Sequence, residues 1–301
     1  MSAKSAPQIF DRQKHARNRS RISGTFKEYA FLKDRVSRDL IERLHDTSHM
    51  FTSGVELGAH DGRLSAALID DPKVKQMLVT DISPDMIALA ANRGLETQIA
   101  DEEHLPFENA QFDLAISALS LHWVNDLPGA LIQIKKTLKP DGLFLGALFG
   151  AGTLSELRDC LVSAETEIRG GVSPRLSPLP GLSDLAGLMQ RAGFALPVVD
   201  KDTVTVRYGS PLKLLHDLKG MGEQAAFRRG MAQPFSRRIL MRAMELYVEN
   251  YADPDGRIRA TFEIVYLSGW APAPHQPQPK RPGSAKVSLA DAINKRRSTS
   301  D

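Results

Sequence analysis

The sequence predicts an α/β protein with a Rossmann-like, doubly wound sheet and helices on both of its faces. Three observations lead to this prediction. From residue 54 to about 150, short apolar runs alternate with helical patterns, which is typical of parallel strands joined by helices. A turn from Gly58 to Gly62 joins the first apolar run to a helical pattern. A second run ends in Asp81 about 20 residues further on, the offset at which an acid accepts hydrogen bonds from ribose hydroxyls.

The apolar runs and the turn signals give the order of the elements. We expect strands at 54–58, 77–81, 97–101, 112–118 and 143–149, with helices between them at 63–69, 84–93 and 126–138. Ser83 suits a helix N-cap, Pro84 the first helical position and Gly94 the C-cap. Outside this core, periodicity predicts helices at 28–45, 153–168, 183–192, 211–219 and 235–250, and strands at 198–208 and 260–270.

Charge is unevenly distributed along the 301 residues, whose net charge is +3. The first 22 residues carry a net +5 and residues 275–301 a net +4, so the body between them is net −6. A body of this sign argues against a broad nucleic-acid surface, because phosphate binding needs clustered cations. The cations of the first segment either form a solvated face or close over an anionic substrate group; they are Arg12, Lys14, Arg17, Arg19 and Arg21.

Cysteine content and hydropathy point to a cytoplasmic protein. The single cysteine, Cys160, excludes an internal disulfide and a cysteine-based metal cage, and its apolar neighbours predict a small core side chain. No run is long enough to span a membrane. The first eight residues hold no apolar signal core, so secretion is not expected. The polar, proline-rich stretch 272–301 predicts a disordered basic tail.

Acidic residues lie at the predicted strand ends, the edge of the sheet where doubly wound folds bind nucleotides. Glu56 lies at the end of the first strand, before the glycine turn, and Asp81 ends the second. Asp101 ends the third and Glu102 comes next, where a carboxylate can accept from the exocyclic amino group of an adenine. The alternative for the acids at the ends of the second and third strands is a solvated position on the surface.

The fourth predicted strand runs through Ser117 toward His122 and Trp123, just beyond its carboxyl end. His122 is a candidate general base, because the pKa of an imidazole lies near neutrality. Trp123 would then form a wall of the pocket. The alternative is a hydrogen-bonded structural histidine beside a core tryptophan.

Four features lie at successive strand ends: a glycine loop, an acid that can bind a ribose, an acid that can bind an adenine, and a segment that lines a pocket. This order resembles the class I S-adenosylmethionine (SAM)-dependent methyltransferases of the methyltransferase-11 type. The resemblance covers about 54 to 150 and implies SAM as the cofactor, with its methionine part at the first strand end, its ribose at the second and its adenine at the third. It implies a seven-stranded sheet whose last strand, 260–270, is antiparallel. The implied cofactor-binding residues are Glu56, Gly58, Ala59, His60, Gly62, Asp81, Ile82, Met86, Asp101, Glu102 and Ser117.

One position departs from the pattern of that family. The family loop alternates three glycines, whereas His60 stands at the middle position here and only Gly58 and Gly62 remain. A side chain at this position has to point away from the ligand, or it weakens binding.

The resemblance extends over nearly the whole chain to one branch, the mitochondrial complex I assembly factor 5 group and its bacterial relatives. It rests on the segments 8–12, 119–128, 149–154, 164–167, 173–178, 220–223 and 281–288. The eukaryotic member of that group is described as an arginine hydroxylase that acts on a complex I subunit. The group is also similar to the BioC-type enzymes that O-methylate malonyl-acyl carrier protein in biotin synthesis.

Three functions therefore compete. The first is methyl transfer from SAM to an unidentified acceptor, a small molecule or a protein side chain, with His122 as the candidate base. The second is arginine hydroxylation or assembly of a respiratory complex I (NADH:quinone oxidoreductase) subunit, which would place the protein at the inner membrane; methylation of malonyl-acyl carrier protein is a further alternative. The third is non-catalytic binding. We predict no metal site, because His45, His49 and His60 lie near acids without a spacing that establishes an iron triad.

These patterns divide the chain into four parts. A basic N-terminal segment and helix occupy 1–45, and the SAM-binding core occupies 46–150. The C-terminal half of the fold follows at 151–271 and contains a helical insertion, 211–252, between the last two strands. This insertion would lie over the strand ends and select the substrate. The predicted tail, 272–301, completes the chain.

Overall fold

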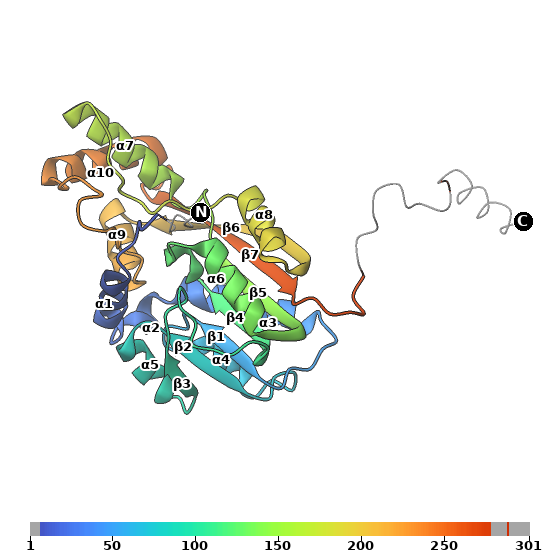
Figure 1. The fold of residues 1–301 in the computed structure, drawn as a ribbon. Coiled ribbons are helices and arrows are strands. Elements are labelled where there is room, and N and C mark those ends of the chain that lie inside the picture. Colours follow the sequence, from blue (N-terminus) through green and yellow to red (C-terminus); the bar gives the residue numbers. More distant parts are fainter. Residues whose placement is uncertain (1–6, 278–287, 289–301) are drawn as a thin grey trace, which may run out of the picture.

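Seven strands form one sheet in the computed structural model, which describes residues 7–277 and residue 288 (Figure 1). Their order across the sheet is β3-β2-β1-β4-β5-β7-β6. The strands are β1 (Gly54–Leu57), β2 (Met77–Asp81), β3 (Glu96–Ile99), β4 (Phe112–Ala118), β5 (Leu138–Phe149), β6 (Ala195–Tyr208) and β7 (Ile258–Trp270). The first five are parallel, and β7 is antiparallel to β5 and β6. The predicted α/β class and the antiparallel seventh strand are confirmed.

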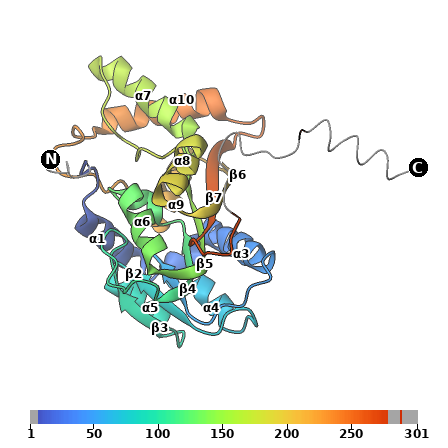
Figure 2. The same cartoon turned by 45° about the vertical axis from the view of Figure 1, so that its right-hand side comes forward.

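Helices cover both faces of the sheet (Figures 1 and 2). They are α1 (Arg12–Ile22), α2 (Phe26–Tyr29), α3 (Phe31–His45), α4 (Arg63–Leu68), α5 (Pro84–Ala91), α6 (Leu127–Thr137), α7 (Ser155–Arg169), α8 (Leu182–Ala192), α9 (Pro211–Gly220) and α10 (Arg237–Tyr251), with a 3₁₀ turn η1 (Leu121–Trp123). Apolar side chains of α3 and α4 pack on one face, with α5 beside them, and those of α6 and α8 pack on the other. Because both faces are covered, the central strands are apolar on both sides.

Local sequence signals account for the helix boundaries that matter for the site. The hydroxyl of Ser83 accepts a hydrogen bond from Met86 N at 3.3 Å, and Pro84 is the first residue of α5, as predicted. Asp11 caps α1 in the same way by accepting from Lys14 N at 2.8 Å. These caps fix where the two helices begin at the carboxyl edge of the sheet.

Three expectations need correction. The predicted helix 28–45 is divided into α2 and α3, because Ala30 leaves the helical conformation between them. The strand predicted at 143–149 begins earlier, at Leu138, with an irregularity where Asp141 takes a positive φ of 65°. The start of the predicted disordered tail is ordered, because Gln276 is buried and donates to Asp141 at 2.6 Å. The remainder of that tail lies outside the described residues, apart from residue 288.

The insertion between β6 and β7 consists of α9, α10 and the loop 221–236 that joins them, as expected. Helix α10 lies alongside α7 in both views, at the end of the molecule where β6 and β7 extend beyond the parallel strands (Figures 1 and 2). Among the described residues, no helix combines the length and apolarity that crossing a bilayer requires.

Candidate functional site

The glycine turn after β1 has the backbone that its sequence requires. Gly58 has a φ of +62°, and a Cβ there would overlap Ser120 and approach Glu102 Oε1 to 2.5 Å. His60, in the position of the missing middle glycine, also takes a positive φ, of 56°. Its ring stacks on Phe26 with a centroid separation of 4.8 Å and an interplanar angle of 11°. The imidazole is therefore held by α2.

Glu56 lies fully buried near the end of β1. Its Oε2 accepts from the Ser65 amide at 3.0 Å and the Ser65 hydroxyl at 2.6 Å, while Oε1 has no hydrogen-bond partner. Lys33 Nζ from α3 lies 3.7 Å from Oε1 and donates to Ala118 O at 2.7 Å. Burial raises the pKa of Glu56, against the charge of Lys33, and lowers the pKa of Lys33 to about 8. One buried oxygen of Glu56 is thus left without a hydrogen bond, with the ammonium group of Lys33 as its neighbour.

Asp81 closes β2 and is also fully buried. Its carboxylate accepts from the backbone amides of His60 and Ser83, each at 2.8 Å, and is paired with the guanidinium of Arg19 from α1. A second guanidinium nitrogen of Arg19 donates to Ser120 Oγ at 2.9 Å. Burial raises the pKa of Asp81, and the charge of Arg19 opposes that rise. The predicted ribose acid is therefore engaged by the chain itself.

The acids after β3 meet the second buried arginine of α1. Glu102 is paired with Arg12 and accepts from the hydroxyl of Ser120. Arg12 also donates to Asp101 Oδ1 at 2.7 Å and to Trp123 O at 3.0 Å. Burial alone would raise the pKa of Glu102, but the charges of Arg12 and Arg19 and the bond from Ser120 lower it to about 2. Glu102 is therefore ionised at neutral pH although it lies in the interior.

The structure brings some of the predicted residues together and leaves others outside the cluster. Glu56 and Gly58 meet at Lys33, and Gly58, His60, Asp81, Asp101 and Glu102 are linked through Ser120, Arg19 and Arg12. Ser117 donates to Leu57 O at 2.9 Å and so joins β4 to β1 beneath the turn. Ile82 is half-buried directly after Asp81. Ala59, Gly62 and Met86 pack among side chains instead: the first two against α5, and Met86 against α1 and α2.

Of the two interpretations of the N-terminal cations, neither describes Arg12 and Arg19. They close over the chain's own carboxylates, whereas Arg17 and Arg21 are exposed. The sequence does contain a signal for this arrangement, because Arg12 and Arg19 are seven positions apart and therefore lie on one face of a helix.

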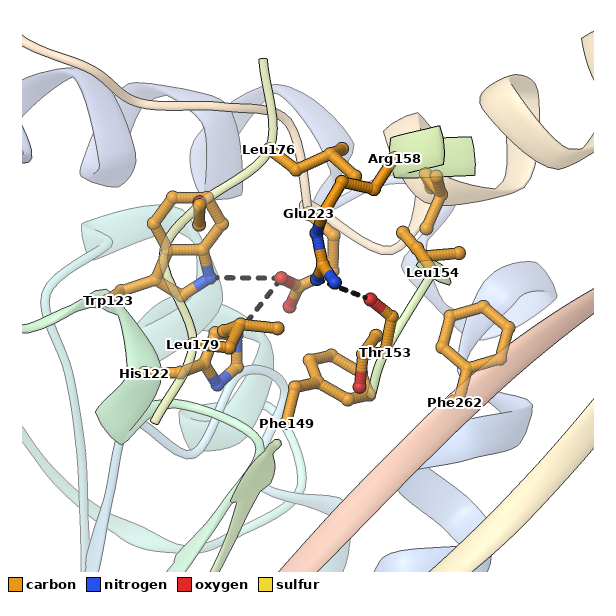
Figure 3. Close-up of a pocket in the computed structure, with 12 residues that line it drawn as sticks. His122, Trp123, Phe149, Thr153, Leu154, Arg158, Leu176, Leu179, Glu223 and Phe262 are labelled. Carbon is orange, nitrogen blue, oxygen red and sulfur yellow. Dashed lines mark hydrogen bonds and ion pairs between the residues drawn. The ribbon is translucent and has the colours of Figure 1, made fainter. Parts of the chain in front are cut away.

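His122 was predicted as a base, and its partner is a residue that sequence reasoning did not assign. His122 Nε2 lies 3.0 Å from Glu223 Oε2, and Trp123 Nε1 donates to the same oxygen at 3.1 Å (Figure 3). A carboxylate only accepts, so Nε2 carries a hydrogen, and in the neutral imidazole Nδ1 then carries the lone pair. That Nδ1 is buried without a hydrogen-bond partner. Glu223 lies in segment 220–223, whose sequence indicates only a family resemblance.

Glu223 lines three cavities in the structure. It lines a cavity of about 50 Å³ together with His122, Phe149 and Arg158, and Figure 3 shows its carboxylate directed at His122 and Trp123. It also lines a cavity of about 20 Å³ beside Lys33 and His60. A third cavity, of about 570 Å³, opens beneath α7, α9, α10 and the loop between the last two. One carboxylate therefore stands between the cofactor-side residues and a large external cavity.

The large cavity has an apolar floor and a cationic mouth. The apolar side chains are Leu157, Leu161, Leu176, Leu215, Leu218, Phe227, Leu240 and Met244. Lys14, Lys219, Arg228 and Arg229 also line it. Within residues 7–277, none of these four side chains is in an ion pair, whereas Arg175 is paired with Glu165.

The three histidines considered for iron lie in separate places. His45 Nε2 is 2.6 Å from Asp71, His49 Nε2 is 3.1 Å from Asp141, and His60 stacks on Phe26. In the described part of the chain, no three His, Cys, Asp or Glu residues are grouped so that they could hold a metal ion.

Comparisons with known proteins agree with this architecture. A family model described as "Methyltransferase domain" matches residues 55–146. The arginine-hydroxylase NDUFAF5, mitochondrial, of Danio rerio is 38% identical over 295 residues, which cover 96% of this chain and 91% of that protein. The corresponding protein of Mus musculus is 40% identical over 291 residues, covering 94% and 83%. The malonyl-[acyl-carrier protein] O-methyltransferase of Halorhodospira halophila is 30% identical over 271 residues, covering 87% and 89%.

Solved structures show the same fold at low sequence identity. Protein BH2331 of Bacillus halodurans superposes with a TM-score of 0.55 at 16% identity and covers 78% of this chain and all of that one. The matched domain is that of SAM-dependent methyltransferases, and SAM is its cofactor.

The residues at the strand ends fit SAM in their chemistry. Oε1 of Glu56 is a buried acceptor without a hydrogen bond, which the ammonium group of the methionine part would supply. The turn at Gly58 is a cradle that a Cβ would fill. Asp81 and Glu102 offer carboxylates at the next two strand ends, where ribose hydroxyls and the adenine amino group are donors. Glu56, Gly58, Asp81 and Glu102 would therefore hold the cofactor.

Proposed function

Because this chain belongs to the methyltransferase-fold family that includes the arginine-hydroxylase NDUFAF5, we propose that it is a SAM-dependent enzyme whose acceptor reaches His122 through the large cavity. When bound, SAM supplies an electrophilic methyl group on a sulfonium sulfur, and the protein supplies alignment and a dry pocket. The residues that would bind the cofactor lie on one side of Glu223, and the cavity that would admit the acceptor lies on the other.

A single observation carries this proposal: Glu223 lines the external cavity, the small cavity at His122 and the cavity beside Lys33. An acceptor with an apolar body fits the floor of the large cavity, and anionic groups on it would meet the unpaired cations at the mouth. Its reactive end would reach His122, whose Nδ1 lone pair can take the proton that a neutral acceptor loses. The carboxylate of Glu223 favours an N–H group at that end and repels a second carboxylate.

Labelled cofactor provides the test. Purified protein is incubated with methyl-labelled SAM and extract of a strain that lacks the gene, and labelled products are separated by size. We expect one labelled acceptor with the unchanged chain and with Glu167→Gln on the exposed face of α7, and a loss of label with Glu223→Gln. Label that is unaffected by Glu223→Gln would refute the assigned path, and absence of any labelled product would refute methyl transfer.

A second candidate is an arginine side chain of a respiratory complex I subunit. The matches to the NDUFAF5 proteins extend well outside residues 55–146, to the N-terminal segment and the α9–α10 insertion that bound the large cavity. A guanidinium at the inner end of this cavity would pair with Glu223, because carboxylates bind guanidinium groups in a bidentate geometry. Such an enzyme would work in the cytoplasm, at the inner membrane where its partner is assembled.

Mass spectrometry separates the two candidates. Complex I subunits from wild-type and deletion strains are digested, and every arginine-containing peptide is compared. Hydroxylation inserts one atom of dioxygen, with an external electron donor reducing the other atom to water, so the wild-type peptide is heavier by one oxygen. Methylation makes it heavier by one methylene group. Identical peptides from the two strains would exclude arginine as the target.

A further inference from the structure

Two arginines of α1 hold the carboxylates to which the cofactor would bind. Arg19 is 1% exposed, pairs with Asp81 and donates to Ser120 at 2.9 Å. Arg12 pairs with Glu102 and donates to Asp101. Both arginines lie on one face of the helix, and both point into the carboxyl edge of the sheet. The buried cations thus stand where the ribose and adenine donors of SAM are expected.

Helix α1 is fastened across this edge by several contacts. The amides of Ile9 and Phe10 both donate to Asn125 Oδ1 at 2.7 Å. Phe10 packs against Trp123 with ring centroids 5.3 Å apart, and Asp11 N donates to Ala226 O at 2.8 Å. The segment before α1 is therefore attached both to the sheet edge and to the loop between α9 and α10.

The space left beside the carboxylates is far too small for SAM. The cavity that reaches His60 and Lys33 measures about 20 Å³, whereas pockets for ligands of this size are on the order of 300–1,000 Å³. Asp81 already accepts from two amides and a guanidinium. A ribose diol and Arg19 are both donors, so they compete for the same oxygens.

We propose that Arg19 competes with the cofactor ribose for Asp81, so that SAM binds only when α1 releases this edge. The inference rests on the use of SAM proposed above and adds a gate to that same site. Because the guanidinium is buried, it cannot leave Asp81 for solvent unless α1 moves with it. The apparent dissociation constant of SAM is then its intrinsic value divided by the fraction of molecules in which α1 is released.

Calorimetric titration of the full chain with SAM tests the gate. Arg19→Gln removes the charge that holds α1 on Asp81, and Arg17→Gln, on the exposed face of the same helix, is the matched control. We expect Arg19→Gln to bind SAM about tenfold more tightly or better, and Arg17→Gln to bind like the unchanged chain. Equal or weaker binding by Arg19→Gln would overturn the inference while leaving the use of SAM intact.

Hydrogen exchange of the unchanged chain gives a second readout that does not depend on the variant folding. Saturating SAM should speed amide exchange in α1, because binding selects the released state. Slower exchange in α1 would show that the helix closes over the cofactor and would overturn the gate. If neither the unchanged chain nor Arg19→Gln binds SAM at millimolar concentration, the proposed use of SAM fails, and the gate fails with it.

Discussion

Gly58→Ala tests whether the crowding of the glycine turn is real. The residue has a φ of +62°, and a Cβ there would overlap Ser120 and approach Glu102 Oε1 to 2.5 Å. Gly94 is the matched control, since its φ is +80° and a Cβ there would have no heavy atom within 4 Å. Both substitutions force an alanine into the left-handed region, but only the first also displaces the Ser120–Glu102 contact.

The magnitudes separate the two effects. The left-handed conformation costs an alanine about 1–2 kcal/mol, and overpacking a close contact costs about 1–3 kcal/mol more. We therefore expect Gly94→Ala to lower the free energy of unfolding by about 1–2 kcal/mol and Gly58→Ala to lower it by about 2–5 kcal/mol. Urea unfolding followed by circular dichroism measures both. Equal losses in the two variants would refute the close approach of the glycine turn to Ser120.

Other predictions concern buried ionisable groups. The Lys33 pKa of about 8 lies below its unfolded value of 10.5, so the unfolded chain keeps that proton longer. As the pH increases from 8 to 10.5, the free energy of unfolding of the unchanged chain should therefore rise by about 3 kcal/mol more than that of Lys33→Met. The Glu102 pKa of about 2 lies below the ordinary value of 4.5, so ionised Glu102 makes its full contribution to the free energy of unfolding above pH 4.5. Measured against Glu102→Gln, this contribution should fall by about 3 kcal/mol as the pH is lowered toward 2. Urea unfolding at a series of pH values checks both predictions. A plot of the free energy of unfolding against pH that runs parallel to that of the variant would contradict the prediction for that residue. Burial raises the pKa of Cys160 to about 12, so an aromatic disulfide reagent should label it only in urea, and rapid native labelling would contradict its core position.

Much of the fold was predictable because its signals are local. The apolar runs that became β1, β2 and β4 are buried on both faces, and the ends of the first two carry the acids Glu56 and Asp81. The cap at Ser83 and the core position of Cys160 also follow from immediate neighbours in the sequence. Parallel strands bring their carboxyl ends to one edge, so the convergence of Glu56, Asp81 and Glu102 follows from the strand order.

The missing parts of the site depend on contacts between distant segments. Glu223 meets His122 from 101 positions away, and Arg19 meets Asp81 from 62 positions away. Lys33 was hidden within an amphipathic helix, because a single lysine in such a pattern normally faces solvent. The spacing of Arg12 and Arg19 places them on one helix face, but no periodicity or spacing identifies the partners that these side chains meet. They arise where the N-terminal segment and the α9–α10 insertion pack onto the same edge of the sheet.

The uneven charge of the sequence acquires a physical meaning from these contacts. The first 22 residues carry a net +5 and the body a net −6, and part of this opposition is realised as the buried pairs Arg12–Glu102 and Arg19–Asp81. Removing one partner of a buried pair leaves an uncompensated charge, so release of α1 from this edge is costly and the released state is rare. Bound SAM lowers that cost, because its hydroxyl and amino groups bring hydrogen-bond donors to both carboxylates. Opening of the edge and binding of the cofactor are therefore coupled through the same two acids.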